Sequence, residues 1–193
     1  MKTKGLSLSL LLVLSAVGML ALMALLIGGV FTETYADPLS QITPTLTPPP
    51  DTRFVAPSGN DTGDCKSYTA PCKTIQYAVN QADAGNEIWI ATFDVQSTGG
   101  LPPTVVTTTA RYTEINTLDG HPQVIYLTKS VTLRGGYTYL HLVPGSEMWI
   151  PGPIPATVDA QGNGRCLYIS GDVTPTVELL AFVEGQADMG GNV

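Results

Sequence analysis

The sequence predicts an all-β protein built from repeated coils, and three observations support this. Aliphatic residues recur at every second position of short segments, as Ile88 and Ile90 do around Trp89, which is the period of a strand with two different faces. Such segments recur at intervals of about 20–30 residues and are separated by glycines, as in solenoids. Only 13% of the residues are charged, and the chain has 20 glycines and 15 prolines, which favours a turn-rich extracellular protein.

Residues 1–36 are predicted to direct export. Two lysines precede an apolar run from Leu6 to Phe31, and Thr34 and Ala36 suit cleavage after Ala36. The run is also long enough to cross a bilayer as an uncleaved anchor. We therefore expect a signal peptide or a membrane anchor, with the rest of the chain secreted or held at the cell surface.

Residues 37–52 are predicted to form a Pro/Thr-rich linker. This composition buries too little apolar surface to fold and favours extended polyproline conformations. We expect it to act as a stalk, and the folded domain to begin at Arg53.

The formal net charge of −7 argues against nucleic acid as a partner. Phosphate backbones are bound by clustered basic side chains. The four arginines are instead spread through the chain, at Arg53, Arg111, Arg134 and Arg165. We expect contact with a membrane only through the N-terminal segment.

Three cysteines in an exported chain suggest one disulfide and one remaining thiol. Cys65 and Cys72 lie in a short loop rich in turn residues, so we predict that they pair. Cys166 is interpreted as a buried or half-buried thiol in a strand, with intermolecular pairing or a reactive role as the alternatives.

The folded part is expected to begin with a strand at Arg53–Ala56, which ends at Pro57 because proline lacks a ladder donor. A turn-rich loop follows at Ser58–Asp64. Apolar residues of Thr74–Ala82 recur at helical spacing, and Gly85 can end that helix. The later segments are predicted to be strands: Glu87–Ala91, Tyr126–Arg134, Thr157–Ala160, Cys166–Ser170 and Thr176–Val183.

Several segments, in their order, carry a resemblance to a known family. They are Phe54–Asp61, Cys65, Cys72, Lys73–Val79, Ser130–Tyr137 and Thr157–Gly162. They resemble the N-terminal part of secreted right-handed parallel β-helix proteins of the pectate-lyase-like superfamily, bacterial surface type. The resemblance implies a single-stranded solenoid over residues 53–193, with the short helix covering the open end of the stack.

The chain departs from that family in three places. Thr92–Ala110 is an insertion that we expect to form an outward loop. Leu179 and Glu184 replace common glycines, so the last coil is expected to be distorted. The sequence ends at Val193, where further coils normally follow, and a solenoid needs about three repeats and a covered end. We therefore expect a fragment of a longer protein.

No group of residues predicts catalysis, a cofactor or a metal. Lyases of this fold hold Ca²⁺ with carboxylates clustered on one sheet and use a nearby cation as the base. The available candidates are Asp159, Asp172, Arg134 and Arg165. Asp159 lies in a turn-like stretch, where its side chain is expected to cap backbone donors.

The remaining polar candidates are interpreted as structural. Asn60, Asp61 and Asp64 suggest a Ca²⁺ loop, but the spacing lacks the required Gly and Glu, so a tight turn is preferred. His121 and His141 have no partner at metal-ligand spacing in the sequence.

Trp149 is the best candidate for contact with carbohydrate, because an exposed indole offers a flat apolar face; packing within a loop is the alternative. We expect a non-enzymatic surface protein that attaches to its surroundings or binds extracellular polysaccharide. The alternative is the N-terminal part of a polysaccharide lyase or glycoside hydrolase whose active site lies on missing coils. The sequence leaves the oligomeric state open.

Overall fold

The computed structural model describes residues 47–99, 103–118 and 120–186. The predicted signal or anchor (residues 1–36), the first part of the linker (37–46) and residues 187–193 lie outside the described residues. Within the described part of the chain, no helix has the length and apolar character needed to cross a membrane.

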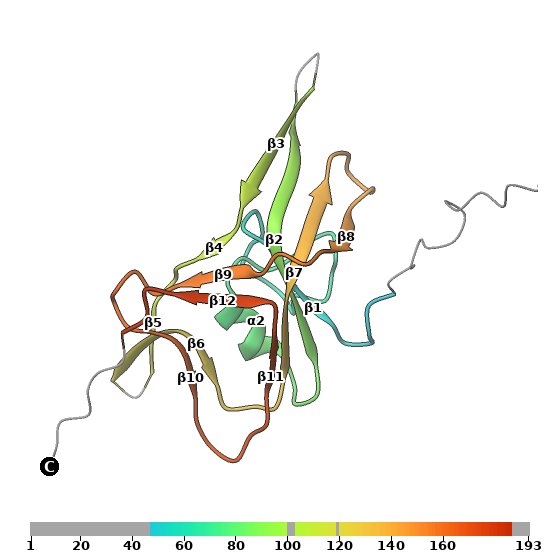
Figure 1. Ribbon diagram of the computed structural model, residues 1–193. Helices are drawn as coiled ribbons and strands as arrows, with labels where there is room; N and C mark the ends of the chain where they lie inside the picture. The colour runs from blue at the N-terminus through green and yellow to red at the C-terminus, as the bar shows by residue number, and fades with distance from the viewer. Residues whose placement is uncertain (1–46, 100–102, 119, 187–193) are drawn as a thin grey trace, which may run out of the picture. The chain divides into compact units, whose positions relative to one another are not determined.

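Strands are the main regular structure of the described chain and one helix is short, which confirms the all-β fold class (Figure 1). The helix, α2, spans Ile75–Gln81. The strands are β1 (Arg53–Val55), β2 (Glu87–Thr98), β3 (Thr104–Thr109), β4 (Arg111–Tyr112), β5 (Asn116–Leu118), β6 (His121–Leu127), β7 (Thr132–His141), β8 (Met148–Pro151), β9 (Ala156–Asp159), β10 (Arg165–Ile169), β11 (Thr176–Glu178) and β12 (Leu180–Val183).

The strands form three sheets, which we call A, B and C. In sheet A, β1, β2, β7 and β11 lie side by side and parallel, with β3 antiparallel to β2 and β8 antiparallel to β7. Sheet B has β4, β9 and β12, all parallel. In sheet C, β10 is parallel to β6, and β5 is antiparallel to β6. Sheets A and C are therefore mixed, whereas the sequence predicted parallel coils alone.

The segment Thr92–Ala110, which was expected to form an outward loop, instead forms a β-hairpin. Its two arms pair as antiparallel β2 and β3, with Phe93 opposite Thr109 and Thr98 opposite Thr104 (Figure 1). The threonine- and valine-rich sequence explains this, because β-branched residues favour extended backbone.

The strand expected at Tyr126–Arg134 is divided by a corner, because β6 ends at Leu127 and β7 begins at Thr132. A second corner separates β11 from β12. Here Leu179 has a φ of 50° and Glu184, just after β12, has a φ of 52°, so both occupy the left-handed region where the family often has glycine.

The faces of sheet A carry two different apolar clusters. Ile88, Ile90 and Leu133 belong to the main core, which α2 also contacts through Ile75, Ala78 and Val79. The alternate residues, among them Phe54 and Trp89, lie on the opposite face and form a separate aromatic cluster. The loop that follows β1 lies beside this second cluster.

Candidate functional site

The candidate site lies next to an aromatic cluster on the outer face of sheet A. Trp89 stacks on Tyr137 with 4.3 Å between ring centroids, and Phe54 packs edge-on against Trp89 at 5.7 Å. Trp149 of β8 lies 5.1 Å from Phe54 and 4.9 Å from Tyr139. These ring contacts make the outer face of sheet A a closely packed apolar surface.

A loop at residues 57–72 is fixed beside this aromatic cluster. The predicted disulfide between Cys65 and Cys72 is present, with 5.3 Å between the Cα atoms. The loop also bonds to β1, since the Phe54 N–H donates to the Cys65 carbonyl and the Ala56 N–H to the Cys72 carbonyl, both at 2.9 Å. The disulfide and the backbone bonds together fix both the middle and the end of the loop.

Gly59 allows the two arms of the loop to approach closely. A Cβ atom at this position would lie 2.4 Å from the Cys72 carbonyl oxygen and 2.6 Å from that of Pro71. The neighbouring Asn60 N–H donates to the Pro71 carbonyl at 3.0 Å. Only glycine fits this crossing without moving the backbone.

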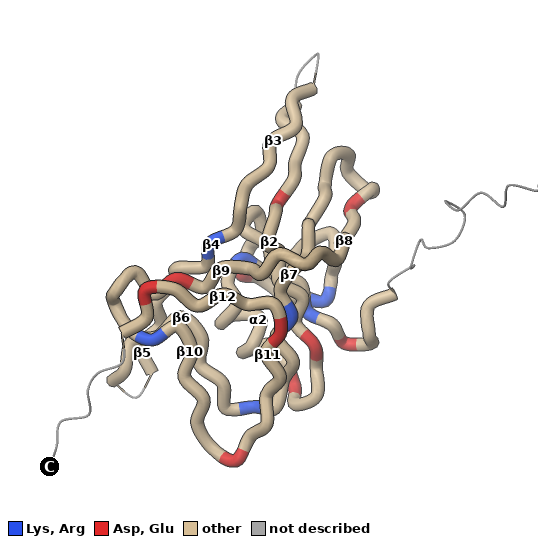
Figure 2. Tube along the Cα trace, in the orientation of Figure 1, with Lys and Arg blue, Asp and Glu red and all other residues tan. Residues whose placement is uncertain are grey.

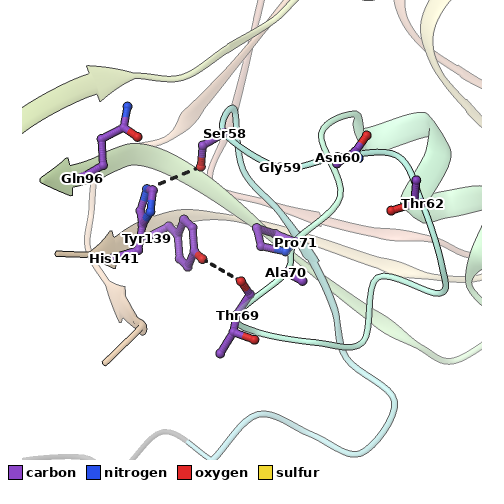
Figure 3. Close-up of a pocket in the computed structure, with 10 residues that line it drawn as sticks. All are labelled: Ser58, Gly59, Asn60, Thr62, Thr69, Ala70, Pro71, Gln96, Tyr139 and His141. Atoms are coloured by element: carbon purple, nitrogen blue, oxygen red, sulfur yellow. Dashed lines mark hydrogen bonds between the residues drawn. The ribbon is translucent and has the colours of Figure 1, made fainter. Parts of the chain in front are cut away.

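A pocket of about 320 Å³ opens between this loop and the ends of β2 and β7 (Figure 3). It lies at the lower end of the size range of small-molecule sites. Its lining residues are Ser58, Gly59, Asn60, Thr62, Thr69, Ala70, Pro71, Gln96, Tyr139 and His141.

The pairing of β2 with β7 places the pocket's polar side chains. Asp94 lies opposite Tyr139, and Gln96 lies opposite His141. Because alternate residues of a strand share a face, these four side chains lie on the same side of sheet A. Asp94 is almost fully buried, with 1% of its surface exposed, while Gln96 is half-buried at the pocket.

Asp94 joins the loop to the sheet through two hydrogen bonds. One carboxylate oxygen accepts the Ser58 backbone N–H at 2.8 Å. The other contacts Nε2 of His141 at 2.6 Å. An ionised carboxylate only accepts hydrogen bonds. Nε2 of His141 therefore carries a hydrogen and donates this hydrogen bond to Asp94.

Ser58, His141 and Asp94 do not form a nucleophilic triad, although the three residue types meet. The Ser58 hydroxyl lies 3.5 Å from Nε2, the same nitrogen that donates to Asp94 (Figure 3). A triad base uses one ring nitrogen for the carboxylate and the other for the hydroxyl. Since Nε2 already carries its proton, it cannot accept one from Ser58.

Tyr139 forms the wall of the pocket and is covered on both faces. Its ring stacks on His141 at 4.6 Å and on Trp149 at 4.9 Å, and its hydroxyl donates to the Thr69 carbonyl at 3.3 Å. Burial raises the pKa of this hydroxyl to about 12, and the carboxylates of Glu147 and Asp94 add to the effect. Only the edge of Tyr139 is left for a ligand.

Trp149, the predicted carbohydrate contact, lies behind this wall and is not among the lining residues. Its ring packs on Tyr139 and Phe54, and its indole N–H donates to the Tyr68 carbonyl at 2.9 Å. The indole therefore supports the pocket, and a direct sugar contact by Trp149 stays a prediction.

Three of the four candidates for lyase-like chemistry have separate partners. Asp159 is buried and pairs with Arg111 at 2.9 Å, and it also accepts the Gln161 N–H, as expected for a turn-capping side chain. Arg134 pairs with two glutamates, Arg165 lies 5.0 Å from the centre of the Tyr168 ring, and Asp172 is exposed.

The loop carboxylates and the remaining histidine also have structural contacts. Asp61 accepts the backbone N–H groups of Lys73 and Thr74, at 2.8 and 2.9 Å, so it fixes the start of α2. His121 lies in β6 beside Tyr168. In the described residues, no three His, Cys, Asp or Glu side chains are grouped to hold a metal ion.

Cys166 is buried in β10 and lies 3.1 Å from the Val183 carbonyl oxygen, which agrees with its interpretation as a thiol in a strand. Asp94 and Gln96 were not identified from the sequence, because they lie within the segment interpreted as an outward loop. The alternation of Asp94 and Gln96 with Phe93 and Val95 was the available signal.

Comparison of the chain with models of protein families, with curated proteins and with solved structures finds no match. The function is therefore inferred from the residues and contacts described above.

Proposed function

We propose that this protein is exported to the cell surface, where it attaches to extracellular polysaccharide without chemically changing it. The observation that carries the proposal is the lining of the pocket, which combines hydroxyl and amide side chains with an apolar edge. Amides and hydroxyls both donate and accept hydrogen bonds, as the hydroxyl groups of sugars require. Pro71 and Ala70 supply apolar contact for the carbon face of a sugar ring.

Binding of a polysaccharide without hydrolysis fits this site better than catalysis does. Glycoside hydrolysis uses a pair of carboxyl groups that flank the bond to be broken. The carboxylate at this pocket, Asp94, is buried behind His141 and Ser58 and holds both of them. Its function in the proposal is to fix the shape of the pocket.

The proposal includes the fold of the resembled family, a right-handed parallel β-helix. In support, β2, β4 and β6 lie in sheets A, B and C in that order, and β7, β9 and β10 follow in the same order. Each strand of the second set is parallel to the strand of the first set in its sheet. The hairpin arms β3, β5 and β8 are then additions to these coils. A crystal structure tests this, because a left-handed path through the three sheets would contradict it.

Export is supported by the Cys65–Cys72 disulfide, since such bonds persist in oxidising compartments outside the cytoplasm. N-terminal sequencing of the protein recovered from cells tests the cleavage. A mature chain that begins at Asp37 is expected for a signal peptide, whereas an intact Met1 indicates the anchor.

Polysaccharide binding is tested by measuring the retention of the full chain on an array of immobilised glycans. The double variant Asn60→Ala/Gln96→Ala removes two amides from the pocket without altering the core. At about 0.5–1.5 kcal/mol for each hydrogen bond, we expect roughly ten-fold weaker binding. Thr107→Ala, on the exposed strand β3, is the matched control and should bind normally. Equal binding by the double variant and the original chain contradicts the proposal.

A further inference from the structure

We infer that the pocket accepts an uncharged sugar unit and excludes a uronate, an inference that rests on the function proposed above. It names the class of polysaccharide as one built of neutral hexose residues.

The side chains that line the pocket carry no fixed charge. Its polar members are Ser58, Asn60, Thr62, Thr69, Gln96, Tyr139 and His141. No Lys, Arg, Asp or Glu is among the lining residues in the part of the chain that the structure describes. A sugar carboxylate entering here would lose water without gaining an oppositely charged partner.

A negative charge lies directly behind the lining. Asp94 contacts Nε2 of His141 at 2.6 Å and the Ser58 N–H at 2.8 Å, and both of these residues line the pocket. With a neutral imidazole, the pair of Asp94 and His141 has a charge of about −1, and with a protonated imidazole it has none. In neither state does the pair present a net positive charge to a ligand.

A second carboxylate strengthens this negative field. Glu147 lies near enough to Tyr139 to contribute to its raised pKa, together with Asp94. The lysines nearest in sequence do not compensate: Lys66 pairs with Asp51, and neither Lys66 nor Lys73 lines the pocket. Within the described residues, no two Lys or Arg are neighbours in sequence, and they appear as separate blue segments of the trace (Figure 2).

The physical consequence is discrimination against anionic sugars. A uronate in the pocket would face the like charge of Asp94 across the His141 side chain, which is close enough for Coulomb repulsion. A neutral hexose of the same ring shape avoids this repulsion and keeps every hydroxyl contact. We expect the uronate to bind at least about ten-fold more weakly.

The test compares matched ligands by isothermal titration. The full chain is purified in a zwitterionic detergent, because detergents with sugar headgroups would compete for the pocket. The probes are neutral hexose oligomers, the uronate oligomers of the same length, and the methyl esters of those uronates. The neutral oligomers should bind, the uronates should bind at least about ten-fold more weakly, and esterification should restore part of the affinity.

Two variants locate the discrimination in the pocket. Gln96→Lys places a cation at the rim and should increase uronate affinity several-fold. Ser97→Lys adds the same charge at the neighbouring position on the other face of β2 and should leave the ratio unchanged. Raised salt should reduce the difference between neutral and acidic ligands, because the discrimination is electrostatic.

The outcomes separate this inference from the function on which it rests. Uronate binding equal to or tighter than neutral binding overturns the inference while leaving polysaccharide attachment in place. Binding of neither ligand class by the original chain removes the proposed function and the inference together. Equal effects of Gln96→Lys and Ser97→Lys would place the discrimination outside the pocket and also overturn the inference.

Discussion

Replacing Asp94 with alanine tests the link between the loop and sheet A. The Asp94 side chain is 2% exposed, and its carboxylate accepts two hydrogen bonds, from the Ser58 N–H and from His141. Hydrogen bonds to charged groups contribute about 1.5–3 kcal/mol each. Ser58 is exposed, so water can replace part of its bond, and we expect a loss of about 2–4 kcal/mol in the free energy of unfolding.

The assay is urea denaturation of the full chain, followed by the fluorescence of its two tryptophans. Asp94→Asn should lose less, because the amide oxygen still accepts one N–H. Asp159→Ala is the matched control, since Asp159 is equally buried but pairs with Arg111 on sheet B. Both alanine variants should be less stable, and only Asp94→Ala should also lose affinity for glycans. A change below about 0.5 kcal/mol for Asp94→Ala would refute the reasoning.

Three further changes probe the same region. Gly59→Ala should cost about 2–3 kcal/mol, because its Cβ would lie 2.4 Å from the Cys72 carbonyl oxygen; an unchanged urea midpoint contradicts this. Replacing Cys65 and Cys72 with serine should lower the free energy of unfolding by about 2 kcal/mol and weaken glycan binding, and a thermal melt with unchanged midpoint argues against it. Burial raises the pKa values of Tyr137 and Tyr139 to about 12, so the folded state holds these protons more tightly than the unfolded state does. This contribution to the free energy of unfolding should be fully present below about pH 10 and should be lost between about pH 10 and 12, by on the order of 2 kcal/mol per tyrosine. A free energy of unfolding that stays constant across this pH range in urea titrations would contradict it.

The sequence was sufficient for features set by local patterns. Alternation predicted the strands, helical spacing over Thr74–Ala82 predicted α2, and the turn-rich loop predicted the Cys65–Cys72 pair. These features depend on residues close together in the chain.

The pocket could not be predicted, because it depends on contacts between distant segments. Asp94 meets Ser58 and His141 only after the β2–β7 register is set, and that register shifts twice between Trp89 and Phe93. Trp149 reaches the cluster only because β8 folds back on β7. Gly135–Gly136 suits a bulge and Pro144–Gly145 suits a turn, but these local signals do not say which distant segments pair.

The most direct test of the central claim is to find where a glycan binds. A neutral hexose oligomer with a photoreactive group is cross-linked to the full chain, and the labelled peptides are identified by mass spectrometry. The account predicts labels in residues 58–71, together with Gln96 or residues 139–141, and their loss in Asn60→Ala/Gln96→Ala. Labels confined to other surfaces, such as the Tyr126 and Tyr168 pair on sheet C, would contradict the account.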